Sequence, residues 1–261
     1  MKFLYLLISI CLTCPIFGQN INTGTSYSGM GNSCVMLSSP ESIYHNVAGI
    51  HNVKNYVVGM SYIEKFNIKE FSTRSLFVVC PFKWFVSAVD YQIFGYSKYC
   101  FDQFGLSIAR SLSSNFSIGV KLRYLHSFIE NYHSHRTDYN IDLGIQYKYK
   151  DYFYIGANIS NLVDNNNPIS EQLFRLGLAY RYTDFLFSFE YDKILDFKEF
   201  YLMGFEYKIL NNFSIKSGYN TIGNTKYFGL EYKYKKFSSS VAFSMHEILG
   251  ISSELSFSYE I

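Results

Sequence analysis

Histidine, the side chain that most often binds metal ions and moves protons near neutral pH, occurs six times in the chain. His133-Ser134-His135 places two imidazoles one residue apart, and His126 precedes them on the same stretch. Such a group could hold a metal ion, but no acidic or cysteine ligand stands at a fixed spacing from it. We therefore expect a solvated external loop here and no metal site.

Ser244 and His246 stand two residues apart and could begin a hydrolytic site. A nucleophilic serine also needs a third group that orients the histidine, within hydrogen-bond reach. Nothing else in the sequence supports such a triad, and no glycine-rich phosphate loop follows a strand-like segment. The formal net charge of +2, without a basic cluster, argues against nucleic acid as a partner. We expect no enzyme, no catalytic residue and no cofactor.

The first residues predict a secretory signal peptide over residues 1–18. Met1-Lys2 supplies a positive charge, an apolar run follows to Leu12, and Gly18 offers a small residue for cleavage. The run is shorter than the roughly 20 apolar residues of a transmembrane helix. Two alternatives are a buried N-terminal strand and a lipoprotein site at Cys14, where the usual small residue before the cysteine is missing.

Three cysteines, Cys34, Cys80 and Cys100, remain after the predicted cleavage, and they show no CxxC spacing. One disulfide is open to them in an exported protein, and whether Cys80 and Cys100 pair is left open. Small, half-buried residues are the favoured interpretation.

The composition restricts the elements that position these residues. Aromatic residues make up 20% of the chain and charged residues only 17%, against about 25% in an ordinary soluble domain. The apolar content excludes a disordered chain. So many Phe and Tyr with so few charges suit either a large β core or a protein that faces lipid.

From about residue 54 onward, apolar and polar residues alternate strictly, which predicts strands with one apolar and one polar face. Phe116, Ile118 and Val120, for example, alternate with Ser117 and Gly119. We count fourteen such segments, and an even number suits a closed antiparallel barrel. The segments begin near Asn55, Thr73, Trp84, Cys100, Asn115, Asp138, Tyr152, Glu171, Phe185, Glu199, Phe213, Thr225, Phe237 and Ile251.

Every second connection is a tight turn, such as Thr183-Asp184, Asn211-Asn212 and Lys235-Lys236. Outer-membrane barrels have short periplasmic turns and longer external loops, and their strands end in aromatic girdles. The sequence therefore predicts an all-β, 14-stranded antiparallel transmembrane β-barrel. The alternative is a soluble barrel or sandwich, because alternation alone does not say which face points outward.

The polar faces of these strands predict the lining of the lumen. The predicted lumen-facing residues are Lys121, Arg123, Asp142, Gln146, Asn158, Arg175, Arg181, Glu190, Glu206, Lys216, Glu231, Lys233 and Glu254. Their mixed sign argues against a strongly ion-selective pore. A water channel and a closed, salt-bridged interior both stay open.

Residues before the first strand do not alternate, and they carry two motifs. Gly29-Met30-Gly31-Asn32-Ser33-Cys34-Val35 comes first, and Asn46-Val47-Ala48-Gly49-Ile50 follows. Together with Asp142-Leu143-Gly144-Ile145-Gln146-Tyr147 in a later strand, they resemble FadL-like outer-membrane barrels, in particular the PorV/PorQ type of Bacteroidetes. The chain departs from the family pattern at Val47, where the family has proline.

The resemblance implies a plug or hatch in the lumen over residues 19–53, formed by Gly29, Met30, Gly31, Asn32, Asn46, Ala48 and Gly49, before a barrel over residues 54–261. Glycines allow positive φ and close approach to the wall, and Asn46 can bond backbone in a tight turn. The alternative is an N-terminal arm without a function.

The family resemblance implies a location in the Gram-negative outer membrane, with its lipid as a partner. The PorV/PorQ type implies an accessory role in type IX protein secretion or the cell envelope, with secretion-machine proteins as partners. The alternatives are a FadL-like transporter of small hydrophobic ligands and a purely structural barrel.

Overall fold

The computed structural model describes residues 25–130, 134–163, 171–195 and 199–261. Its strands are β1 Val57–Glu64, β2 Ser72–Pro81, β3 Val86–Tyr96, β4 Tyr99–Ser111, β5 Phe116–Ile129, β6 Ser134–Tyr149, β7 Phe153–Ser160, β8 Leu173–Tyr182, β9 Phe185–Ile194, β10 Glu199–Leu210, β11 Phe213–Asn220, β12 Thr225–Tyr234, β13 Phe237–His246 and β14 Gly250–Glu260. The short helices are α2 Thr25–Ser28, η1 Pro40–Tyr44, η2 Val47–Asn52, η3 Lys65–Asn67, η4 Lys69–Phe71 and η6 Ile222–Asn224. Within the described residues, every helix is too short or too polar to cross a membrane.

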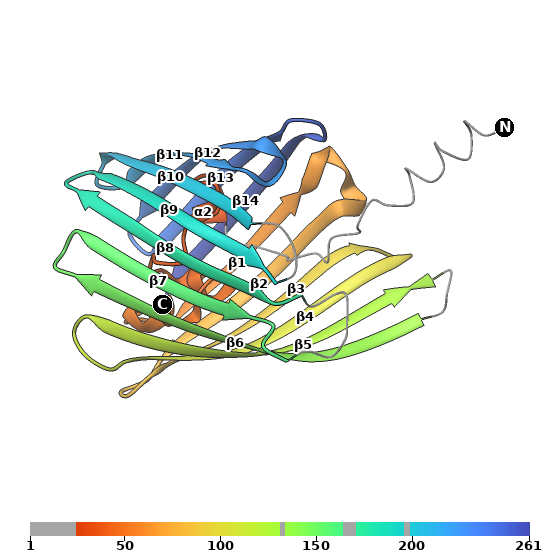
Figure 1. Cartoon of the computed structure of the whole chain (residues 1–261), viewed down its shortest axis with the longest axis horizontal. Helices are drawn as coiled ribbons and strands as arrows, with labels where there is room; N and C mark the ends of the chain where they lie inside the picture. Colours follow the sequence, from red (N-terminus) through yellow and green to blue (C-terminus); the bar gives the residue numbers. More distant parts are fainter. Residues whose placement is uncertain (1–24, 131–133, 164–170, 196–198) are drawn as a thin grey trace.

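Each strand pairs antiparallel with its neighbours in sequence, and β1 pairs with β14, so the sheet closes (Figure 1). At the closure Val57 lies opposite Glu260. The predicted closed antiparallel barrel of fourteen strands is confirmed. The largest difference in a strand start is at β6, which begins at Ser134 and not near Asp138. The first residues of β6 pair with β5 although they do not alternate between apolar and polar types. The sequence pattern therefore places the start of this strand too late.

The barrel exposes its apolar face and buries its polar face. On β8, Leu176, Leu178 and Tyr180 are exposed, whereas Arg175 is buried. Other exposed apolar side chains around the wall are Leu106, Ile108, Leu122, Ile145, Phe187, Phe228, Phe243, Leu255 and Phe257. A water-soluble barrel would show the reverse pattern, because its apolar residues would fill the interior. An apolar outer band is the surface that a membrane barrel presents to lipid.

The two ends of the barrel differ in their connections. Thr183-Asp184 joins β8 to β9 and Lys235-Lys236 joins β12 to β13, at what we call the tight-turn end. Thr183 and Lys235 have φ of 50° and 53°. Positive φ is what a two-residue hairpin turn requires, because its twist then matches that of the strands. Longer connections, such as the one between Ser160 and Leu173, lie at the opposite, long-loop end.

Residues 26–53, which we call the N-terminal segment, lie within the ring of strands (Figure 1). Helix α2 contacts β12, β13 and β14, and η2 contacts β4, β5 and β6 on another part of the wall. The Ser39 hydroxyl caps η1 by accepting from the Glu41 backbone N–H, 3.1 Å away. One apolar cluster joins η1 and η2 to the wall. Its buried members are Ile43, Val47, Ile50, Val57, Phe77, Val79, Val86, Ala88 and Ala109.

Candidate functional site

The backbone of the N-terminal segment lies directly against glycines of the barrel wall. A Cβ added to Gly119 on β5 would lie 2.5 Å from the Ala48 nitrogen, and one on Gly156 of β7 would lie 2.5 Å from the Met36 Cα. A Cβ on Gly204 of β10 would lie 2.7 Å from a backbone oxygen of the segment. These distances are shorter than the contacts that Cβ atoms make in real proteins. A side chain at any of these inward positions would therefore prevent the segment from packing against the wall.

The first motif of the segment meets the wall in the same way. A Cβ on Gly29 would lie 2.7 Å from the Gly229 Cα of β12. Gly31 and Asn32 follow with φ of 67° and 63°, a left-handed turn that glycine and asparagine adopt most readily. Met30, which lies between Gly29 and Gly31, is fully buried. The motif thus forms a compact turn pressed against β10–β12.

Asn46 links the second motif to the first and to the wall. Its side-chain nitrogen donates to the carbonyl oxygens of Val35 (2.7 Å), Ile145 (3.0 Å) and Ala157 (3.3 Å). Its side-chain oxygen accepts from the Ala48 N–H at 3.1 Å and so caps η2. Gly49 completes this turn, because a Cβ there would lie 2.6 Å from a hydroxyl of η1.

Charged side chains of the wall bind the backbone of the segment. Glu190 on β9 accepts hydrogen bonds through Oε2 from the backbone N–H groups of Cys34 (2.6 Å) and Val35 (2.9 Å). Lys121 on β5 donates to the Ile43 carbonyl at 2.9 Å and pairs with Asp90 at 2.7 Å. Because these groups are buried, each replaces water as the hydrogen-bond partner of the segment.

Two further wall residues complete this attachment. Gln146 on β6 donates to the carbonyls of Val35 and Leu37, both at 3.0 Å, and accepts from the Ser38 hydroxyl at 2.8 Å. Arg175 on β8 donates to the His45 carbonyl at 3.4 Å and lies 3.7 Å from the carboxylate of Asp192.

Burial shifts the titration of groups in the segment. Desolvation, with the nearby charges of Arg175 and Lys121, lowers the pKa of His45 to about 3, so its imidazole is neutral at physiological pH. Desolvation raises the pKa of Cys34 well above its ordinary value, so the thiol stays protonated and is a poor nucleophile. Cys34, Cys80 and Cys100 are all free thiols.

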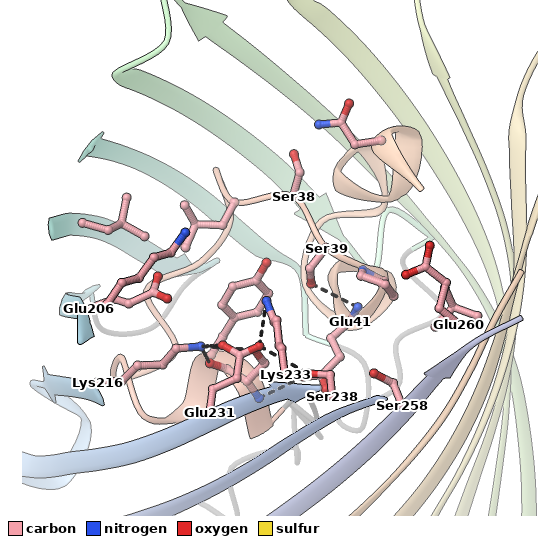
Figure 2. A pocket seen from close by; sticks show the side chains of 18 of the residues that line it. Ser38, Ser39, Glu41, Glu206, Lys216, Glu231, Lys233, Ser238, Ser258 and Glu260 are labelled. Carbon is pink, nitrogen blue, oxygen red and sulfur yellow. Dashed lines mark hydrogen bonds and ion pairs between the residues drawn. The ribbon is translucent and has the colours of Figure 1, made fainter. Parts of the chain in front are cut away.

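A polar cavity of about 550 Å³ lies between the segment and the tight-turn end (Figure 2). At its inner side Glu231 accepts from Lys216 at 2.5 Å, and Lys233 approaches the same carboxylate at 3.0 Å. Lys216 also donates to the Ser26 carbonyl at 2.6 Å, which ties the segment to β11. Other cations that line the cavity are Lys148, Arg181, Lys208, Lys235 and Lys236. Apolar side chains, among them Leu37, Leu186 and Phe237, line the cavity beside these charged groups.

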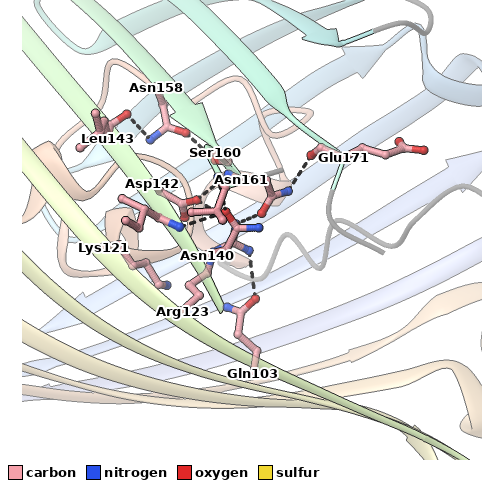
Figure 3. A network of polar contacts seen from close by, with 12 residues as sticks. Gln103, Lys121, Arg123, Asn140, Asp142, Leu143, Asn158, Ser160, Asn161 and Glu171 are labelled. Atoms are coloured by element: carbon pink, nitrogen blue, oxygen red, sulfur yellow. Dashed lines mark hydrogen bonds and ion pairs between the residues drawn. The ribbon is translucent and has the colours of Figure 1, made fainter. Parts of the chain in front are cut away.

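A second polar network cross-links the wall itself (Figure 3). Arg123 on β5 donates to Gln103 at 3.2 Å, to Asp142 at 2.8 Å, and to the side-chain oxygen of Asn161. Asn161 follows β7 in a left-handed conformation and also donates to the backbone carbonyl of residue 171 at 2.6 Å. Asn158 donates to the Leu143 carbonyl across the β6–β7 ladder, at 3.1 Å. These contacts hold neighbouring strands together on the side of the long loops.

All the residues expected in the lumen, except Lys233, are buried or half-buried on the inner side of the wall. Twelve of the thirteen fall into the contacts to the segment (Lys121, Gln146, Arg175, Glu190), the polar cavity (Arg181, Glu206, Lys216, Glu231, Lys233) and the wall network (Arg123, Asp142, Asn158). The thirteenth, Glu254 on β14, is buried outside these groups. Sequence reasoning missed Asp90, the partner of Lys121, although it occupies an inward position of β3 between Ala88 and Gln92.

The expected external loop includes His133, which lies outside the described residues. Within the described residues, no three or more His, Cys, Asp or Glu side chains are grouped so as to hold a metal ion.

No family model and no curated protein matches this chain in sequence. Solved structures do match it. The toluene transporter TodX of P. putida is 9% identical, with a TM-score of 0.70 over 93% of this chain and 99% of that one. The monoaromatic hydrocarbon channel CymD is 12% identical, with a TM-score of 0.69 over 93% and 98%. A FadL homologue of Pseudomonas aeruginosa is 10% identical, with a TM-score of 0.62 over 91% and 98%. At these identities the likeness shows the fold alone, which resembles that of these three proteins.

Proposed function

We propose that this protein spans the outer membrane and passes small hydrophobic molecules across it. The observation that carries the proposal is the closed 14-stranded barrel with an apolar outer face, matched along nearly its whole length by hydrocarbon channels. Lipid cannot satisfy open backbone groups, so a closed barrel is one of two structures able to span it. The predicted signal peptide over residues 1–18 supplies the export that this location requires, and it lies outside the described residues.

In this proposal the N-terminal segment is the plug of the channel. Asn46, Glu190 and Lys121 hold it across the lumen through backbone hydrogen bonds. Net hydrogen bonds contribute about 0.5–1.5 kcal/mol each, so several together give an attachment that is firm yet reversible. The polar residues around the segment let water replace these contacts when the segment shifts.

A buried apolar cluster on the inner face near the long-loop end is where, in this proposal, a hydrophobic molecule enters when the cluster opens. Phe94, Phe101 and Leu125 form it, and Tyr99 packs against them. Phe71 of η4 stacks on Phe94, with ring centroids 6.4 Å apart. Aromatic rings arranged in this way suit planar apolar ligands, because offset stacking and edge contacts add to the burial of apolar area.

The comparisons favour this role over an accessory role in type IX secretion. The PorV/PorQ type, which our sequence analysis put first, gains no support from them, and the alternative of a FadL-like transporter does. We therefore propose the transporter role and retain no secretion partner.

Uptake by intact cells tests the proposal. Lipopolysaccharide slows apolar solutes far more than a phospholipid bilayer does, so whole cells are better suited to the measurement than simple liposomes. We expect cells that contain the barrel to accumulate radiolabelled toluene faster than cells that lack it, at equal uptake of a polar sugar. Equal toluene uptake by the two strains would contradict the proposal.

A further inference from the structure

Four polar side chains from three strands form a chain of contacts near the long-loop end. The Cys100 thiol donates to Asp102 Oδ1 at 3.4 Å, and Asp102 Oδ2 lies 3.6 Å from His126 Nδ1. His126 Nε2 in turn lies 3.3 Å from His135 Nδ1. Residues 100 and 102 belong to β4, and the two histidines belong to β5 and β6. Strand pairing therefore brings together residues up to 35 positions apart in the sequence.

The chain of contacts lies on the outer face of the wall, beyond the aromatic residues of the apolar band. Asp102 is directly opposite His126 in the β4–β5 register, and on β5 and β6 the histidines share a face with Tyr124 and Tyr139. The rings of those two tyrosines meet edge to face with their centroids 5.4 Å apart. They lie nearer the middle of the strands than the two histidines do. About 29% of the His126 side chain and 27% of that of Asp102 are exposed, so solutes can reach both.

We propose that His126 and His135 form a binding site for a late first-row divalent cation, with Zn²⁺, Cu²⁺ and Ni²⁺ as the fitting ions. Imidazole nitrogens are preferred ligands of these metals. Two nitrogens that bind one tetrahedral Zn²⁺ at about 2.0–2.1 Å lie roughly 3.3 Å apart, which is the separation observed. The site has two protein ligands, and water or a group from outside fills the remaining positions.

Asp102 is the positioning residue of this site. A carboxylate beside Nδ1 favours the tautomer with its proton on that nitrogen, which leaves the Nε2 lone pair free to bind metal. The thiol of Cys100 holds the other carboxylate oxygen and so fixes the orientation of Asp102.

A hydrogen bond between two neutral imidazoles is the competing explanation of the short separation. The rings lie within 25° of parallel, with centroids 5.6 Å apart. A shared metal ion requires both lone pairs to point at one position, and the Cβ–Cγ torsion of histidine is broad enough for each ring to turn. A hydrogen-bonded pair without metal affinity would instead keep its geometry when metal is added.

Calorimetric titration of the detergent-purified, untagged barrel with Zn²⁺ and with Cu²⁺ separates the two explanations. We expect one saturable site that His126→Gln and His135→Gln each weaken at least tenfold. Asp102→Asn should weaken it by about 10–100-fold, as removal of an outer-shell carboxylate does. His246→Gln is the matched control, because it removes another imidazole at the same end of the barrel and should change nothing.

Nitrogen superhyperfine structure in the Cu²⁺ spectrum supplies a second readout, which should report two imidazoles in the wild type and one in each single variant. The heat-dependent gel shift of the barrel verifies that every variant is folded. Wild-type affinity in both His126→Gln and His135→Gln would overturn the proposal. A site that only His133→Gln abolishes would overturn it as well.

Discussion

The carboxylate of Glu190 lies 2.6 Å from the backbone nitrogen of Cys34, so a side chain of the barrel wall binds the main chain of the N-terminal segment. The same oxygen accepts a second hydrogen bond, from the next residue, at 2.9 Å. Two consecutive N–H groups directed at one carboxylate form a small anion-binding concavity. The segment thus contributes backbone N–H groups to this contact, and the wall contributes the side chain of Glu190.

Replacing Glu190 with alanine should release the segment. Each buried N–H that loses its partner costs about 1–3 kcal/mol. The fraction of molecules with the segment released should therefore rise at least tenfold. The reporter is the thiol of Cys34, which is 1% exposed, in a background where the other two cysteines are serine. Its rate of reaction with a maleimide should increase in Glu190→Ala. Glu190→Gln, which keeps an acceptor oxygen, is the matched control and should react more slowly than the alanine variant.

Replacing Gly156 with valine should have the same effect through a different cause. A Cβ at this position would lie 2.5 Å from the Met36 Cα, and backbone cannot move aside as a flexible side chain does. We expect faster labelling of Cys34 with an unchanged gel shift of the folded barrel. Leu178→Val, on the outer face of the neighbouring strand β8, should leave labelling unchanged. An unaltered labelling rate in Gly156→Val would argue against close packing of the segment on the wall.

Release of the segment should also depend on pH through His45. Its pKa is lowered from 6.5 to about 3 in the docked form. The released form therefore binds a proton between these values that the docked form does not, and docking weakens as the pH falls from about 6.5 toward 3. The expected slope is about 1.4 kcal/mol per pH unit in that window, with none from this residue at higher pH.

The pKa of Glu41 is raised by burial, so this residue acts in the opposite direction around and above its ordinary value of 4.5. The contribution of His45 is therefore read as the difference between the wild type and His45→Phe. Equilibrium accessibility of Cys34 between pH 7 and 5 measures it, after correction for the intrinsic reactivity of the thiol. Identical pH profiles for the two proteins would show that His45 has no such role.

The outer face should tolerate charge only near its edges. Leu178 is 52% exposed near the middle of β8, and Tyr182 ends that strand at the tight-turn end. Arginine costs about 2–4 kcal/mol at the bilayer midplane and about 0–1 kcal/mol near the interfaces. Leu178→Arg should therefore destabilise the barrel in vesicles by more than Tyr182→Arg, as measured by denaturant titration. Equal losses would contradict the placement of lipid around the barrel.

The barrel could be predicted from the sequence because its signal repeats along every strand. The alternation of Leu176 and Leu178 with Arg175 and Gly177 establishes the period, and the sorted turns predict closure. Alternation is symmetric, however, so other signals favour an outward apolar face. These are turn sorting, the leader, the aromatic strand ends, and the number of large apolar side chains, which would overfill the interior of a soluble barrel. The exposed Leu178 and the buried Arg175 settle that orientation in the structure.

Contacts across strands could not be predicted, because they depend on register as well as on period. Cys100 and Asp102 stand far from His126 in the sequence, and a shift of β4 by one residue would place them on the opposite face. The glycines of the wall carried no signal of their own either. Gly119 and Gly156 read as ordinary strand residues until the N-terminal segment is seen against them.

The most direct test of the central claim is the initial rate of toluene uptake by intact cells that lack the barrel, contain it, or contain Phe101→Asp. The aspartate places a charge in the apolar cluster at the long-loop end, where Phe101 is 6% exposed. The account predicts the fastest uptake with the wild-type barrel, a several-fold slower rate with Phe101→Asp at equal amounts of folded protein, and the slowest rate without the barrel. Equal rates in all three strains would contradict it.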